Sequence, residues 1–401
     1  MDRDELNGWL RLLLTPQIGP IAARKVLAAF GAPQAVFEAP TRALQAVVGE
    51  VAAQALGREP QDLAAHVQTT LDWLAASPAH AVLTLGDAAY PARLLEMADP
   101  PLLLFAQGRL DALRGPLLAI VGARHPTPQG ADNARAFAAH FSRQGWTVVS
   151  GLAAGVDGAA HEGALDGPSP TIAVVGTGLD RVYPARHRAL AHRIVEQGLI
   201  LSEYLLGTPP LAPNFPKRNR LIAALGQGTL VVEAAVQSGS LITARLAAEM
   251  GREVLAIPGS IHNPLSRGCH ALIKQGAKLV ETAEDVLEEL RGGLRPSLFG
   301  AGTATGPGDG AEARTTMGGN SLPPQPAEPD AAASGDEDMQ GGGGPYAALL
   351  QALGWDPVHL DALAARTGIG PAALQAQLLE LELAGEVARL PGQLFQRQGR
   401  A

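Results

Sequence analysis

Residues 117–124 read Leu-Leu-Ala-Ile-Val-Gly-Ala-Arg, an apolar run that ends in a glycine and a cation. Six further short runs rich in Val, Ile and Leu follow it, with helical stretches between them, at residues 147–150, 171–175, 199–202, 229–233, 253–257 and 278–280. Near-continuous apolar strands that alternate with helices are typical of a parallel sheet covered on both faces. The sequence therefore predicts a doubly wound, Rossmann-like α/β domain over residues 81–291.

The flanking regions differ from this pattern. Residues 1–80 are predicted to form a small helical unit, in which the turn at 16–23 resembles a helix-hairpin-helix; an ordinary turn with Gly19 as a helix C-cap is the alternative. Residues 292–344 lack periodicity and are rich in Gly, Pro and acids, which predicts a disordered acidic linker. Residues 345–398 suggest three helices (347–353, 358–367 and 371–384) and a hairpin over 386–397, a winged-helix pattern.

Charge is distributed unevenly along the 401 residues, whose formal net charge is −8. Residues 181–220 hold seven Lys or Arg against two Glu, whereas residues 292–344 hold seven acids against two Arg. A basic stretch inside an acidic chain permits a polyanionic ligand. The single cysteine, Cys269, excludes an internal disulfide, and neither a signal-peptide charge pattern nor a membrane-spanning apolar run occurs. We therefore expect a cytoplasmic protein without a membrane segment.

Small residues follow several of the predicted strands, at 122–124, 150–157, 176–180 and 238–240. In a doubly wound sheet, ligands bind beyond the carboxyl ends of the strands, where such loops expose backbone amides to an anion. The segment Phe215-Pro216-Lys217-Arg218-Asn219-Arg220 adds three cations and an aromatic ring at the start of an apolar run. Such a segment suits a phosphate backbone and a stacked base, although solvated cations at a helix start are the plainer interpretation.

The sequence lacks the motifs of several classes of enzyme. No P-loop, complete dinucleotide fingerprint or nucleophile elbow occurs, and His161-Glu162 lacks a second histidine at metal spacing. Ser238 and Ser240 have no identifiable base partner, so we interpret them as ligand-binding or capping residues. We expect no catalytic residue, metal or cofactor. The alternative is a nucleotide-processing phosphoribohydrolase-like enzyme, because Gly226-Gln227-Gly228-Thr229 with Glu233 loosely matches that signature without its leading Pro-Gly-Gly.

The order of these loops over residues 120–280 resembles the DprA/Smf family, the DNA-processing proteins of bacterial transformation. The matching segments are 121–124, 150–157, 176–180 with Tyr183-Pro184, 215–223, 233–234 with 238–244, Pro258-Gly259, and 268–277. The helical N-terminus resembles the SAM-like domain of that family, and residues 345–398 resemble its winged helix. One departure is that the third helix of this winged-helix unit offers Gln375 and Gln377 but no cation, which makes it a poor major-groove reader. Arg366, Arg389 and Arg397 are the remaining candidate contacts there, so we expect the unit to bind protein, or DNA weakly through its wing.

The resemblance implies a non-enzymatic protein that binds and protects single-stranded DNA and delivers it to the RecA recombinase; double-stranded DNA is left open. It also implies a homodimer formed through the end of the sheet, at His270, Ile273 and Leu279. The residues then expected to contact DNA are Gly122, Arg124, Gly151, Gly155, Asp157, Arg186, Phe215, Lys217, Arg218, Asn219, Arg220, Ser238 and Ser240.

Overall fold

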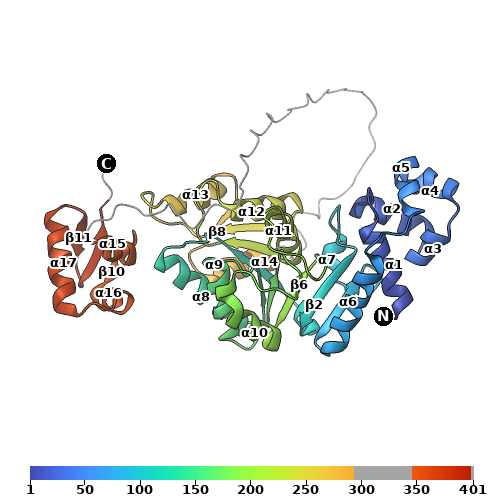
Figure 1. Cartoon of the computed structure of the whole chain (residues 1–401). Coiled ribbons are helices and arrows are strands. Elements are labelled where there is room, and N and C mark those ends of the chain that lie inside the picture. The colour runs from blue at the N-terminus through green and yellow to red at the C-terminus, as the bar shows by residue number, and fades with distance from the viewer. Residues whose placement is uncertain (293–345, 399–401) are drawn as a thin grey trace, which may run out of the picture.

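The computed structural model describes residues 1–292 and 346–398 (Figure 1). These residues form an N-terminal group of helices, a central nine-stranded sheet and a small C-terminal unit. In Figure 1 the N-terminal helices and the C-terminal unit lie at opposite ends of the central sheet. The predicted linker, residues 292–344, lies outside the described residues apart from Gly292, the last residue of helix α14.

Seven strands of the central sheet are parallel, as the sequence predicts, in the order β6-β5-β4-β3-β7-β8-β9. Their bounds are β3 (Leu117–Val121), β4 (Thr147–Ser150), β5 (Thr171–Val174), β6 (Leu199–Ser202), β7 (Gly228–Val231), β8 (Glu253–Ala256) and β9 (Lys278–Leu279). The chain winds outward from β3 to β6, then returns to β7 on the other side of β3. The strand order therefore reverses beside β3, and a doubly wound fold binds ligands at that reversal.

Two additional strands, β1 (His80–Thr84) and β2 (Leu103–Gly108), extend the sheet antiparallel beyond β6. Neither is among the seven strands predicted from the sequence. Their connection contains only the short helix α7 (Ala92–Leu95) and not the crossover helix that marks a parallel pair. The predicted doubly wound core is therefore confirmed, and an antiparallel edge is added to it.

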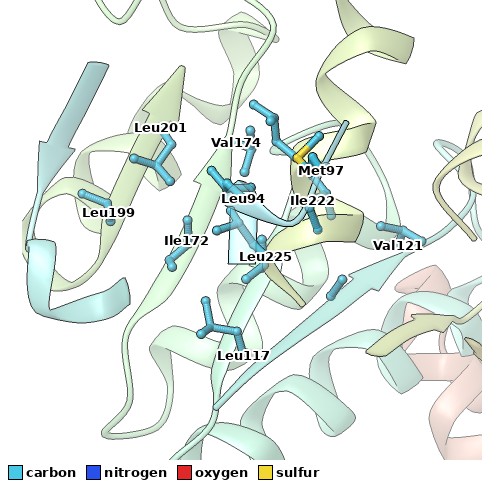
Figure 2. Close-up of a cluster of buried hydrophobic side chains, with 14 of the residues drawn as sticks. Leu94, Met97, Leu117, Val121, Ile172, Val174, Leu199, Leu201, Ile222 and Leu225 are labelled. Carbon is cyan, nitrogen blue, oxygen red and sulfur yellow. The ribbon is translucent and has the colours of Figure 1, made fainter. Parts of the chain in front are cut away.

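Successive side chains of a strand point to opposite faces of the sheet, and helices cover both faces. Leu118 and Ile120 face α8 (Pro128–Arg143), α9 (Val156–Leu165) and α14 (Ala283–Gly292). Leu117, Ala119 and Val121 face the opposite side, where α11 (Asn214–Leu225), α12 (Gly239–Glu249) and α13 (Arg267–Lys274) pack. Figure 2 shows part of this second core, in which side chains of α11 meet those of the central strands. Helix α10 (Arg188–Gln197) packs on β5 and β6.

The N-terminal helices are α1 (Arg3–Leu14), α2 (Pro20–Phe30), α3 (Pro33–Glu38), α4 (Thr41–Val48), α5 (Glu50–Leu56) and α6 (Leu63–Ala76). Leu12 of α1 packs among these helices, whereas Leu6 and Leu10 pack with Phe105 of β2. The edge strands therefore attach the helical unit to the sheet. Gly19 is the N-cap of α2 with an extended backbone (φ −79°), so its alternative interpretation as a C-cap is wrong.

The C-terminal unit has the predicted winged-helix arrangement of three helices and a hairpin around one apolar core. Its elements are α15 (Ala347–Leu353), β10 (Val358–His359), α16 (Leu360–Thr367), α17 (Pro371–Leu383), β11 (Val387–Leu390) and β12 (Leu394–Arg397). The predicted helix at 358–367 begins two residues late, because Val358 pairs with Phe395 and His359 with Leu394 in a three-stranded sheet.

Candidate nucleic-acid interface

A cavity of about 1080 Å³, which we call the groove, lies beyond the carboxyl ends of the central strands, at the reversal beside β3. It is bounded by the loop after β3, the first turn of α11, the start of α12 and residues 263–265. The residues predicted to contact DNA that line it are Gly122, Arg124, Asp157, Phe215, Arg218, Asn219, Ser238 and Ser240. Loops from four separate parts of the sequence therefore converge there.

Arg218 lies in the floor of the groove and is only 4% exposed. Its Nη1 donates hydrogen bonds to the carbonyl oxygens of Gly151 and Val174. Burial lowers the pKa of Arg218 to about 10, although the nearby Asp157 opposes this shift, so the side chain stays charged at neutral pH. The structure thus places Arg218 as a buried cation that joins two strand ends, and not as the open phosphate clamp expected from the sequence.

Asp157 shares this buried position at the start of α9. Its Oδ2 accepts hydrogen bonds from the backbone N–H groups of Gly151 (3.1 Å) and Ala153 (3.3 Å), and burial raises its pKa. A Cβ atom on Gly151 would lie 2.1 Å from Nη1 of Arg218, so only glycine fits between the two charges. Asp157 and Gly151 therefore shape the floor.

Gly155 explains the glycine-rich loop after β4. It has a φ of 80°, and a Cβ atom there would lie 2.3 Å from the carbonyl oxygen of Ala123. That carbonyl accepts a hydrogen bond from Val156 N at 3.1 Å. Gly122 is equally confined, since its Cβ would lie 2.7 Å from Cγ2 of Val156. These glycines let the loops after β3 and β4 touch backbone to backbone, which carries Arg124 to the rim.

The three cations of the predicted basic segment, residues 215–220, point in different directions from helix α11. Residues 215, 218, 219 and 222 are spaced at one helical face and line the groove. Lys217 is exposed outside the groove lining. Arg220 does not line the groove and forms an ion pair with Glu203. Its Nε lies 3.5 Å from Asp99 Oδ2, and its Nη1 donates a hydrogen bond to the Asp99 carbonyl oxygen at 2.8 Å. Of the three cations in this segment, only Arg218 belongs to the groove.

Arg124 and Phe215 are the groove residues best placed to meet a ligand. Arg124 is exposed and has no ion pair among the described residues. Phe215 is half-buried, and its ring centroid lies 5.4 Å from that of Tyr183, which is 49% exposed. A cation without an ion pair and a partly accessible aromatic ring in one groove suit a phosphate and a base. Arg186, also predicted, is exposed in the short helix η2 (Ala185–His187) and does not line the groove.

Helix α12 begins at the groove. Ser238 is its N-cap, and the Ser238 Oγ accepts a hydrogen bond from Ser240 N at 3.4 Å and lies 2.7 Å from the Ser240 Oγ. Ser238 therefore caps the helix, and the Ser240 side chain, in its first turn, bonds to that cap. The N-terminus of a helix of this length attracts anions through its free N–H groups and its dipole.

Two further buried polar residues, Glu233 and His161, have structural partners. Glu233 accepts hydrogen bonds from Thr127 N (2.8 Å) and Thr127 Oγ1 (2.6 Å), and burial raises its pKa. His161 is fully buried in α9 with Nδ1 2.8 Å from Thr171 Oγ1, and burial lowers its pKa to about 3. His161 is thus a neutral core histidine, and no cluster of three potential metal ligands occurs within 1–292 and 346–398.

The predicted dimer residues lie at the β9 end of the sheet. Leu279, on edge strand β9, is 41% exposed. Ile273 of α13 is half-buried against the core, and His270 Nε2 lies 3.0 Å from the Gly259 carbonyl oxygen. Only Leu279 of the three is largely free for a partner in this structure.

The C-terminal unit borders the groove. No sequence motif predicts this contact between the two parts of the chain. Trp355, Arg366 and Arg397 line it together with the loop after β3. Arg366 Nη2 pairs with Asp132 Oδ2 at 3.1 Å across 234 residues of sequence. An isolated arginine in a sequence cannot reveal such a contact, because no local pattern relates segments so far apart.

Among the described helices, none is both long and apolar enough to cross a bilayer.

Comparison with known proteins agrees with this architecture. The family model described as DNA recombination-mediator protein A matches residues 81–291, and the DprA winged helix domain matches residues 323–393. The chain is 41% identical over 327 residues to Protein Smf of Escherichia coli, covering 81% of this chain and 79% of that protein. It is 49% identical over 203 residues to the DNA processing protein DprA of Streptococcus pneumoniae, covering 51% of this chain and 72% of that protein.

An X-ray structure of DprA from Streptococcus pneumoniae has a similar fold, with a TM-score of 0.62 and 38% identity. The match covers 72% of this chain and 98% of that one. These findings confirm the resemblance inferred from the loops. The chain belongs to the DNA recombination-mediator protein A family, the DprA/Smf proteins.

Proposed function

We propose that this protein binds single-stranded DNA in the groove and acts as a non-enzymatic mediator that delivers the strand to a RecA-type recombinase. The observation that carries the proposal is the position of Arg124. This exposed cation, unpaired among the described residues, faces the same groove as Phe215 and the N-terminus of α12. Cations hold phosphates of any sequence, and an aromatic face stacks an unpaired base, which a duplex does not offer.

The polar groups around the groove favour binding over catalysis. The carboxylates of Asp157 and Glu233 are buried and accept hydrogen bonds from backbone N–H groups. Thr229, part of the phosphoribohydrolase-like alternative, is fully buried in β7. Incubation of the purified protein with nucleoside monophosphates should release no free base. Release of base that disappears in a Glu233→Gln variant would support the enzyme instead.

The mediator role rests on the family to which the chain belongs, whose description names a recombination mediator. Within that role we place the protein in the cytoplasm during DNA uptake by natural transformation, as a homodimer that joins at the β9 edge. Two grooves on one particle raise the effective concentration of the second site on a bound strand. Purified protein should accelerate RecA filament formation on DNA coated with single-strand-binding protein; an unchanged rate would contradict the mediator role.

Charge reversal of Arg124 tests the groove. Arg124→Glu should weaken binding to fluorescein-labelled oligo-dT and lower the salt slope by about 0.7 for each phosphate that is no longer neutralised. The matched control is Arg143→Glu, another exposed arginine at the end of α8, near the amino ends of the strands. Equal affinities for Arg124→Glu and the parent protein would contradict the groove. A labelled duplex of the same length measures whether double-stranded DNA binds as well.

A further inference from the structure

We infer that the winged-helix unit forms the second wall of the groove and that Trp355 and Arg397 contact the bound strand directly. This inference rests on the proposed function, because it concerns the same ligand in the same groove. It adds a binding surface from a part of the chain whose predicted recognition helix carries no cation.

The winged-helix unit is held beside the groove. Trp355, Arg366 and Arg397 line the same cavity as Arg124 and Phe215. Two contacts hold the unit there: the Arg366–Asp132 ion pair at 3.1 Å, and the ring of Trp355, whose centroid lies 6.3 Å from that of His262. The groove is therefore bounded by both folded units, and its volume is slightly above the usual range of small-molecule pockets, about 300–1,000 Å³.

Trp355 and Arg397 form a pair with the chemistry that a single strand needs. The guanidinium carbon of Arg397 lies 4.6 Å above the Trp355 ring, and Arg397 has no ion pair among the residues described. The second wall therefore carries the same two kinds of side chain, a cation and an aromatic ring, that Arg124 and Phe215 contribute to the first. Stacking on an aromatic ring with a neighbouring arginine is a sequence-tolerant way to hold single strands.

The two walls carry charge of the same sign. A lid that only blocked the groove would present carboxylates to its cations, whereas this unit adds Arg397, which has no ion pair among the described residues, to the groove that Arg124 lines; Arg366 is already paired with Asp132. Asp356 of this unit does not line the groove. Its charge acts on Glu233, whose carboxylate accepts a hydrogen bond from the Thr127 hydroxyl. Cations on both walls are drawn together by a polyanion between them. The observations thus favour a wall that is completed by DNA.

The structure also separates the three arginines of this unit that the sequence marks as candidates. Arg366 and Arg397 line the groove, whereas Arg389, on β11, is exposed outside it. Gln375 and Gln377 of α17 do not line the groove either. The proposed surface is therefore the region of Trp355 and β12, and not the third helix that a winged-helix protein places in a major groove.

The test measures oligo-dT affinity of the full chain by fluorescence anisotropy. Trp355→Ala should weaken binding about 5- to 150-fold, the range expected for loss of one base–aromatic stack. Arg397→Glu should also weaken binding and reduce the salt slope. Arg389→Glu, the same charge change on the same unit, should leave affinity unchanged. Trp355→Phe should retain most of the affinity yet reduce the quenching of tryptophan fluorescence by the bound strand.

The outcomes are distinguishable. If Arg124→Glu weakens binding while Trp355→Ala and Arg397→Glu do not, the inference is wrong and the proposed function stands. If none of the three weakens binding, both are wrong. Tighter binding by Arg397→Glu or Trp355→Ala would instead show that the unit obstructs the groove. If only Arg389→Glu weakens binding, the strand contacts the hairpin at Arg389 and not Trp355 and Arg397, and the inference is wrong. Should Trp355→Ala fail to fold by circular dichroism, Trp355→Phe and Arg397→Glu decide the question.

Discussion

Replacement of Arg218 by methionine distinguishes a buried structural cation from a surface clamp. The guanidinium is almost fully enclosed and donates to the carbonyl oxygens of Gly151 and Val174 beside Asp157. Methionine fills a similar volume but supplies neither charge nor donors. A buried charge that loses its partner costs about 3–5 kcal/mol of unfolding free energy, because the remaining ion stays desolvated and uncompensated. We expect Arg218→Met to destabilise the central domain by roughly that amount.

The destabilisation should depend on pH through Asp157. Burial already raises the pKa of this carboxyl above its ordinary value of 3.8, and Arg218 opposes the shift. Without Arg218 the pKa in the folded state rises further. A folded state that holds a proton more tightly than the unfolded state loses stability as pH rises from the unfolded pKa through the folded pKa. The cost of Arg218→Met should therefore be smallest below pH 3.8 and complete above the raised folded pKa.

Urea unfolding followed by far-ultraviolet circular dichroism at about pH 4 and about pH 7 measures both effects. Adding Asp157→Asn to Arg218→Met should recover part of the stability and flatten its pH dependence, since the uncompensated charge is gone. If Arg218→Met keeps the parent unfolding free energy at neutral pH and loses only oligo-dT affinity, the buried role is wrong. Arg218 would then be the open clamp that the sequence suggested.

Exposure and burial predict three other outcomes. Phe215→Ala should weaken oligo-dT binding by about 1–3 kcal/mol, measured by anisotropy, and unchanged affinity would remove its ring from the stacking surface. Leu279→Glu, a cleaner change than Ile273→Glu because Leu279 is the more exposed, should yield monomers by light scattering; an unchanged mass would exclude β9 from a dimer contact. Burial raises the pKa of the Cys269 thiol to about 12, so native protein should resist iodoacetamide at neutral pH, and rapid labelling would show that α13 opens.

The sequence alone determined the parallel strands, the loops that follow them and the winged-helix unit. These features depend on local patterns: apolar runs of strand length, and glycines where the space for a side chain is taken, by a neighbouring backbone at Gly155 and by two charged side chains at Gly151. They also sufficed to recognise the family. The strands β1 and β2 were not predicted, and their antiparallel direction does not follow from their residues, because strand direction depends on the connection and on the neighbouring strand.

Only the tertiary structure decided which cations line the groove. In the sequence Lys217, Arg218 and Arg220 look alike, yet successive residues of a helix project about 100° apart. Their surroundings therefore differ: Arg218 enters the floor, Arg220 pairs with Glu203, and Lys217 stays in solvent. The same holds for Trp355 and Arg397, which border the groove with Arg124 only because the chain folds back across some 234 residues, the separation of Arg366 from its ion-pair partner. Burial and pairing are properties of neighbours in space, and a linear pattern does not contain them.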